Sequence, residues 1–207
     1  MRFDSLIGLI IEESSLALKH VVAALISLVF NPYSFAVALF PISAWKDGNP
    51  YYAFISLASL AIFPFTFHYH GVKSGKTNWN VDERWKRPKY LLLSSTGGFI
   101  GSSLLGLMGA KYLSIATAVY ATTAFFVAIA SYFIKVSVHV STAVTTAIVL
   151  GWALGLWWGV AFGAIALVVA WSRVVLKAHR PVEVAEAYAI SSFSSILILS
   201  VLRAIPM

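Results

Sequence analysis

Long stretches without a charged residue dominate the chain. Asp, Glu, Lys and Arg are all absent from residues 21–45, 90–110, 112–134 and 136–172. A hydrocarbon layer of about 30 Å selects for uncharged helical segments of about 20 residues. The pattern therefore predicts an all-α fold, a polytopic transmembrane helical bundle.

Polar positions divide this pattern into seven apolar segments. We expect them at residues 20–45, 51–69, 90–109, 113–134, 139–156, 158–176 and 184–203. The number of spans is six or seven, because Asn31-Pro32 interrupts the first segment and the charge-free run 136–172 has to be divided. Glycines and tryptophans within residues 151–159 favour a tight reversal there.

The first residues do not follow the pattern of a cleavable signal peptide. Asp4, Glu12 and Glu13 interrupt the region where an apolar core would be needed, so we expect the N-terminus to be retained. Residues 3–19 mix leucine and isoleucine with charges. We expect either an interfacial helix that leads into the first span or the frayed start of a long first helix.

Composition and charge narrow the class of protein further. Of the 207 residues, 59% are hydrophobic and 11% are charged, so the chain is one integral-membrane domain, residues 1–207, without a substantial soluble part. The lack of cysteine excludes disulfides, thiolate metal sites and a cysteine nucleophile. A net charge of +7 favours anionic lipid headgroups as partners, and we expect no nucleic acid.

Small residues in the third segment predict close helix packing. They recur at spacings of four residues, at Gly97, Gly98, Gly101, Ser102 and Gly106. Such residues allow another helix backbone to approach closely. We therefore read them as a packing surface.

Three polar clusters stand at segment ends and are the candidate chemistry. They are residues 80–88, 135–139 and 172–183. Two spans separate each cluster from the next, so all three are expected at the same membrane face. Ionisable groups at the edge of an apolar bundle are costly unless they face a polar cavity or one another, which predicts a shared site.

The residue types in these clusters favour phosphoryl transfer to histidine. His139 and His179 can act as nucleophile or acid near neutral pH. Arginine forks suit phosphate oxygens, and Glu183, four residues after His179, can orient the ring. A divalent metal is disfavoured, because one glutamate and two histidines offer few hard oxygen ligands among cationic arginines.

The spacing of these residues resembles a known family. Ser172-Arg173-x5-His179-x3-Glu183 is similar to the third signature of the type 2 phosphatidic acid phosphatase superfamily, with Glu in place of Asp. Residues 137–139 resemble the second signature, with Val138 where the family has Gly. Arg87-Pro88 resembles the end of the first, with Asn80 where the family has Lys.

The resemblance implies a role for each matched residue. His179 would attack phosphorus, Glu183 would orient it, and His139 would protonate the leaving oxygen. The phosphate oxygens would be held by Arg87, Arg173 and the Ser137 region. Lys76, Arg84 or Lys135 would replace the cation missing at Asn80.

These observations predict a metal-independent lipid phosphatase without a cofactor. Its substrate would be a phosphomonoester or diphosphate on a polyprenyl or glycerolipid, cleaved through a phosphohistidine. Two alternatives share the fold: a non-catalytic protein that binds or transports lipid phosphates, and a lipid phosphotransferase.

The distribution of basic residues predicts the orientation. The loop of residues 71–89 contains six of the fifteen Lys and Arg residues, and alternating spans put it on the same side as Lys135 and residues 173–180. The opposite side keeps Lys46, Lys111 and Arg203. The positive-inside rule then makes the face with the site cytoplasmic.

Overall fold

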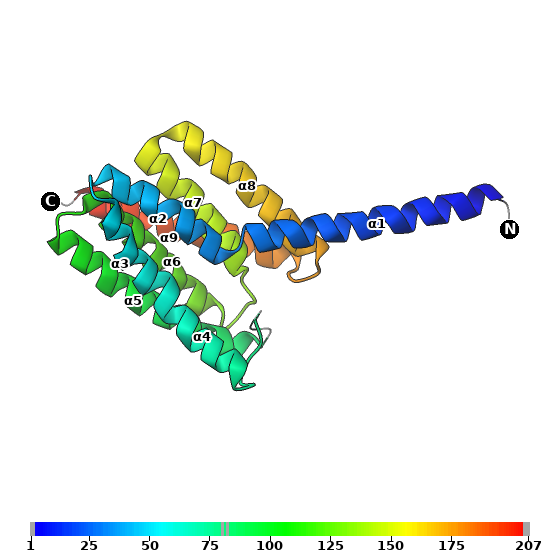
Figure 1. The fold of residues 1–207 in the computed structure, drawn as a ribbon, viewed down its shortest axis with the longest axis horizontal. Coiled ribbons are helices and arrows are strands. Elements are labelled where there is room, and N and C mark those ends of the chain that lie inside the picture. The colour runs from blue at the N-terminus through cyan, green and yellow to red at the C-terminus, as the bar shows by residue number, and fades with distance from the viewer. Residues whose placement is uncertain (1–2, 80, 82, 205–207) are drawn as a thin grey trace.

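The protein is a bundle of α-helices with no strand in the part of the chain that the structure describes (Figure 1). This computed structural model describes the backbone of residues 3–79, 81 and 83–204, and the side chains of residues 16–79, 81 and 83–202. The helices are α1 (Phe3–Val29), α2 (Pro32–Lys46), η1 (Pro50–Tyr52), α3 (Ala53–Leu57), η2 (Ala58–Ile62), α4 (Phe63–Lys73), η3 (Arg84–Lys86), α5 (Arg87–Leu107), α6 (Lys111–Ala130), α7 (Val138–Leu154), α8 (Leu156–Val175) and α9 (Pro181–Ala204). The predicted all-α bundle is confirmed.

Six of the seven predicted segments correspond to one helix or one helical stretch, and the first corresponds to the end of α1 and to α2. Among the described residues, five stretches are long and apolar enough to cross a membrane, and the bent pair of α1 and α2 adds a sixth. Helix α7 is shorter, at 17 residues, but is equally apolar. The chain is therefore a multi-pass membrane protein by the length and composition of its helices.

The first segment is broken at the position that the sequence indicated. The Asn31 side chain accepts hydrogen bonds from the backbone N–H groups of Tyr33 and Ser34, at 2.9 and 3.1 Å, and so caps α2. Pro32 occupies the first turn of that helix, where it loses no hydrogen bond. Helix α1 and helix α2 meet at 43°. Helix α1 is one unbroken helix from Phe3, so the N-terminal segment is part of a long first helix but its backbone is helical from that residue on.

Glycines bring the helices close together at the two predicted places. A Cβ atom at Gly97 would lie 2.5 Å from the backbone oxygen of Ser59 in η2, so only glycine fits there. Gly155, with φ of +109°, forms the reversal between α7 and α8. Beside it Gly151 and Gly159 face each other closely, with 3.0 Å between one Cα and a Cβ built on the other. The packing surface and the reversal are both confirmed.

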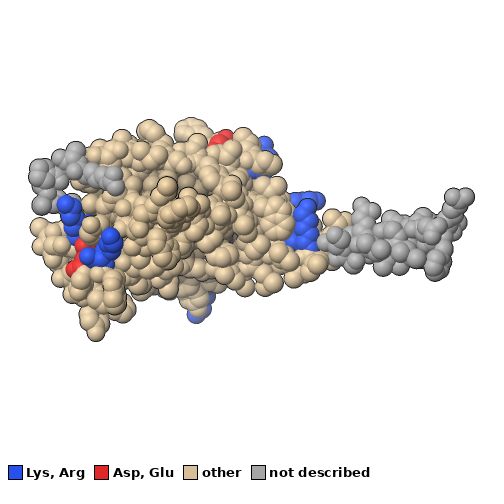
Figure 2. Space-filling view, turned by 90° about the horizontal axis from the view of Figure 1, so that it is seen from above, with Lys and Arg blue, Asp and Glu red and all other residues tan. Residues whose placement is uncertain are grey.

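The packing places α6 and α7 in the centre of the bundle. Helix α6 packs against α5 and α9, and α7 packs against α8 and α9. Helix α2 covers α6 and α7, whereas α1 lies along α8. On the face shown in Figure 2 charged side chains lie only near the margins, and the broad middle is uncharged. This is the surface expected of a protein surrounded by lipid.

Candidate active site

Four polar residues from the three clusters line one cavity. They are Arg87 at the start of α5, His139 in the first turn of α7, Arg173 near the end of α8 and His179 in the loop before α9. The cavity has a volume of about 680 Å³. The helices alternate in direction, so these four positions fall at the same end of the bundle, as the even number of intervening spans predicted.

His179 is held by two acceptors at one ring nitrogen. Its Nδ1 lies 3.0 Å from the backbone oxygen of Lys135 and 3.2 Å from Oε2 of Glu183. Because both neighbours are acceptors, Nδ1 of the neutral ring carries the proton. The lone pair is therefore on Nε2, which is the nitrogen available for attack on a ligand in the cavity.

Glu183 is fixed from a second side by Arg180. The Arg180 backbone N–H donates to Oε2 at 3.1 Å, and its Nε donates to Oε1 at 2.9 Å. Glu183 lies in the first turn of α9, next to Pro181 at the start of the helix, where a carboxylate is favoured by the helix dipole. The extra methylene of Glu relative to Asp is accommodated by this placement. The role of Arg180 was missed, although its i,i+3 spacing to Glu183 was a signal for it.

The two arginines are buried and are anchored by neutral groups. Arg87 donates from Nε to the backbone oxygen of Val81 at 2.8 Å and from Nη1 to that of Val136 at 3.0 Å. Arg173 donates from Nη1 to the Ser27 hydroxyl at 2.6 Å. Both side chains are only 7–8% exposed. No spacing in the sequence indicates the contribution of Ser27 or of the carbonyl groups.

The polar end of the cavity has a positive electrostatic character. Arg87 and Arg173 contribute two fixed charges, and the cavity wall formed by the described residues contains no Asp or Glu. Burial, followed by the Arg87 and Arg173 guanidiniums, lowers the pKa of His179 from its ordinary value of 6.5 to about 4. His179 is therefore neutral near pH 7, as a nucleophile must be.

Four predicted site residues lie outside the cavity wall: Glu183, which contacts His179, and Lys135, Arg84 and Ser137. Lys135 donates from Nζ to the backbone oxygen of Ala178 at 3.3 Å, and Arg84 donates to that of Phe133. Ser137 is fully buried at the start of α7. Lys135 and Arg84 thus tie the loops around the site to each other. Asn80, where the family has Lys, lies outside the described residues.

Beyond its charged end the cavity is mostly apolar and reaches toward the bundle centre. Its walls include Ala36, Leu60, Ala61, Leu91, Ala124 and Val127. The π-helical turn η2 contributes Leu60 and Ala61. The inner part also has hydroxyl groups, among them Thr145, which donates to Thr123 at 3.2 Å. Such a cavity has one end for an anion and a body for hydrocarbon.

Comparison with known proteins leaves the family open. No protein-family model, no curated protein and no solved structure matches the chain. Among the described residues, no three His, Asp or Glu side chains gather as a metal-binding set. The assignment of function therefore depends on the geometry of this site and on the motifs in residues 80–183.

Proposed function

We propose that the protein is a metal-independent lipid phosphatase that cleaves a phosphomonoester or diphosphate through a phosphohistidine. One observation supports this more than any other. His179, oriented by Glu183, lies at the arginine-lined end of a cavity whose remaining walls are largely apolar. An oriented, neutral nucleophile beside two fixed cations is the arrangement that phosphoryl transfer needs.

The reaction proceeds in two displacements. Nε2 of His179 attacks phosphorus, a P–N bond forms, and the P–O bond to the lipid or to its remaining phosphate breaks. The negative charge of the bound phosphate offsets Arg87 and Arg173, so His139 can carry the proton that it donates to the leaving oxygen. Water then attacks the phosphohistidine and loses a proton to His139, the P–N bond breaks, and inorganic phosphate leaves with His179 restored.

The two arginines and a helix end stabilise the transition state. Negative charge on the three equatorial phosphate oxygens faces Arg87 and Arg173, which are already fixed and so need no rearrangement. Helix α7 begins at Val138, and its positive dipole end lies beside the cavity that Val138 and His139 line. Glu183 favours the proton on Nδ1 throughout.

The size and lining of the cavity support a lipid as substrate. A cavity of about 680 Å³ lies within the usual range for small-molecule sites. A methylene occupies about 30 Å³, close to the share of one water molecule in the liquid. The cavity therefore has room for a phosphate and much of one hydrocarbon chain, from either a polyprenyl lipid or a glycerolipid.

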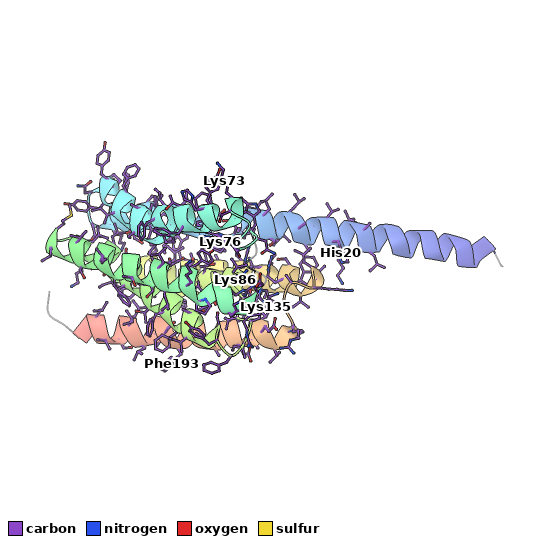
Figure 3. The ribbon with its side chains drawn as sticks, turned by 90° about the horizontal axis from the view of Figure 1, so that it is seen from below. His20, Lys73, Lys76, Lys86, Lys135 and Phe193 are labelled. Atoms are coloured by element: carbon purple, nitrogen blue, oxygen red, sulfur yellow. The ribbon has the colours of Figure 1, made fainter. Side chains whose placement is uncertain are left out.

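The orientation of the site is part of the proposal. Lys73, Lys76, Lys86 and Lys135 lie near one another, around the end of α4 and the start of α5 (Figure 3). This is the end of the bundle at which α4 and α8 finish and α5, α7 and α9 begin. We place it on the cytoplasmic side because basic residues concentrate there.

Purified protein assayed in EDTA against a panel of lipid phosphates tests the proposal. The panel should contain polyprenyl monophosphates and diphosphates and phosphatidate, with release of inorganic phosphate as the readout. Release from at least one lipid, lost in His179→Ala, is the expected result. Saturable binding without any release would instead favour a lipid-phosphate binding protein, and transfer to an added lipid alcohol would favour a phosphotransferase.

A further inference from the structure

The cavity opens to the outside between α1, α2 and the loop before η3. Most of its lining residues are buried or half-buried, but Leu28, Tyr33 and Trp79 both line it and are exposed, by 69%, 40% and 58%. Pro64 and His68 of α4 line the cavity beside them. The opening is therefore bordered by apolar and aromatic side chains.

The broken first span creates this opening. Helix α1 ends at Val29 and lies along α8, whereas α2 turns away by 43° to cover α6 and α7. Asn31 and Pro32, at the break itself, line the cavity. A straight helix would continue in the direction of α1 beyond this point and would cross the opening. The break at Asn31 and Pro32 instead leaves a gap between the start of α2 and α4.

An aromatic pair spans the gap. The ring of Tyr33, in the first turn of α2, meets the ring of Phe65 on α4 edge to face, with centroids 5.5 Å apart. Phe65 also stacks on Trp79 at 6.3 Å and on Tyr69 at 6.2 Å. Edge-to-face pairs contribute about 0.5–1.5 kcal/mol beyond buried area, which is weak enough to separate repeatedly.

The depth of this pair in the bilayer identifies what lies outside it. With about 1.5 Å of rise per residue, Tyr33 lies about 20 Å from Lys46, and Phe65 about 22 Å from Pro50, along their helices. Lys46 and Pro50 mark the face opposite the site. In a hydrocarbon layer of about 30 Å, the pair is about 8–10 Å inside the boundary on the side of the site. The opening therefore faces lipid chains.

We infer that the gap between the α1–α2 break and α4 is a lateral portal for the hydrocarbon chain of a lipid phosphate, and that Tyr33 and Phe65 are its gate. This inference rests on the proposed function for the identity of the ligand. The chain enters sideways when the two rings separate, while the phosphate moves along the boundary to Arg87 and Arg173. Charge at one end and apolar walls at the other match the two parts of such a lipid.

Cross-linking across the portal tests the inference in a chain that has no natural cysteine. The double variant Tyr33→Cys/Phe65→Cys, reconstituted in vesicles, is measured before and after treatment with a short, reducible bis-thiol reagent. Two substrates are compared, a long-chain polyprenyl phosphate in the vesicle and water-soluble para-nitrophenyl phosphate. We expect cross-linking to lower the ratio of lipid to soluble hydrolysis at least tenfold, and reduction to restore it.

A matched pair away from the portal provides the control. Ser102 on α5 and Ser114 on α6 have hydroxyl oxygens 3.3 Å apart and lie outside the cavity wall. Cross-linked Ser102→Cys/Ser114→Cys should leave the substrate ratio unchanged. An unchanged ratio after cross-linking Tyr33→Cys/Phe65→Cys, or an equal loss in the control pair, would overturn the portal.

Photolabelling separates failure of the portal from failure of the proposed function. A prenyl phosphate with a photoreactive group near its phosphate end is added to the native protein in vesicles, and the labelled peptides are mapped. Labels concentrated on the peptides around Leu28, Tyr33 and Leu60 support the portal even if no phosphate is released. Labels spread evenly over the lipid-facing helices would overturn it, whatever the catalytic result.

Discussion

Arg87 and Val136 are joined by a hydrogen bond from Nη1 to the backbone oxygen, 3.0 Å long, although they are 49 residues apart. The bond ties the start of α5 to the loop that precedes α7. A second bond from Nε reaches Val81. Arg87 therefore shapes the backbone around the site besides supplying a charge to it.

Replacing Arg87 by lysine should separate these two contributions. Lysine keeps the charge but has a single donor group and cannot reproduce the fork that reaches both carbonyl oxygens. We expect kcat/KM to fall about 100-fold, corresponding to about 2.7 kcal/mol of lost transition-state stabilisation. Steady-state kinetics on the best lipid substrate measure this. A variant within threefold of the native protein would show that charge alone is required.

Loss of either histidine should stop the reaction at a different step. His179→Ala removes the nucleophile, so no phosphoenzyme should form and turnover should fall at least a thousandfold. His139→Ala should slow both steps while leaving the nucleophile in place. The substrate is labelled with radioactive phosphorus, and the reaction is stopped rapidly without acid because phosphohistidine is acid-labile. Peptide mapping then shows which residue carries the label. Label on His179 in His139→Ala is expected, and label elsewhere would contradict the assignment.

The acid limb of the pH profile should lie well below that of an ordinary histidine. The lowered pKa of His179, about 4, keeps the ring neutral as pH falls through 6.5, and attack is lost only when the ring is protonated near pH 4. Bound substrate phosphate offsets the arginine charges, so the limb in kcat should lie at higher pH than the limb in kcat/KM. Arg173→Gln removes one cation and should raise the limb in kcat/KM. A limb in kcat/KM near pH 6.5 in the native protein would contradict this account.

Asp47 should stabilise the bundle at the end opposite the site. Its carboxylate accepts hydrogen bonds from the backbone N–H groups of Tyr112 and Leu113, at 2.9 and 2.7 Å, and so caps α6 from the turn that follows α2. Asp47→Ala should lower the free energy of unfolding by about 1 kcal/mol. Thermal unfolding in detergent measures the loss of stability. Gly48→Ala serves as a comparison, because Gly48 has a φ of +75° and alanine would strain the same turn. Substrate turnover at low temperature should not change.

Labelling from outside the cell tests the orientation. Ser74 follows α4 at the end of the bundle that contains the site, and the chain has no other thiol to interfere. Ser74→Cys should resist an impermeant maleimide on intact cells and react after permeabilisation. Strong labelling on intact cells, with a cysteine in the buried part of α6 unlabelled, would put the site on the outer face.

The sequence predicted the spans well because their cause is local. Charge-free length, the Asn31-Pro32 break and the glycines at 151–159 act within a few residues, and the helices follow them. Counting the spans was enough to predict that one end of the bundle contains Arg87, His139, Arg173 and His179. In contrast, the anchors of the site connect residues far apart in the chain. Ser27 reaches Arg173 across 146 residues, and no periodicity reports such a contact.

The positions of the candidate cationic residues show a second limit of prediction from the sequence. Lys135 and Arg84 were predicted as phosphate ligands from their sequence position beside the motifs. In the structure their side chains bond to backbone oxygens of the surrounding loops and lie outside the cavity wall. A charge near a motif can serve the loop that carries the motif as well as the ligand, and only the fold distinguishes the two. That Lys135 and Arg84 bind the phosphate remains a prediction.

The short length of α7 affects the depth of the site. Seventeen residues extend about 26 Å, several ångströms less than a typical hydrocarbon layer and less than the 20 residues of α8 beside it. No residue of α7 is exposed, so other helices and not lipid surround it, and the bilayer does not have to adapt to its length. The shortfall instead leaves room for a cavity where α7 begins. A headgroup therefore has to leave the membrane surface to reach His139, and the hydrocarbon chain attached to it has to follow.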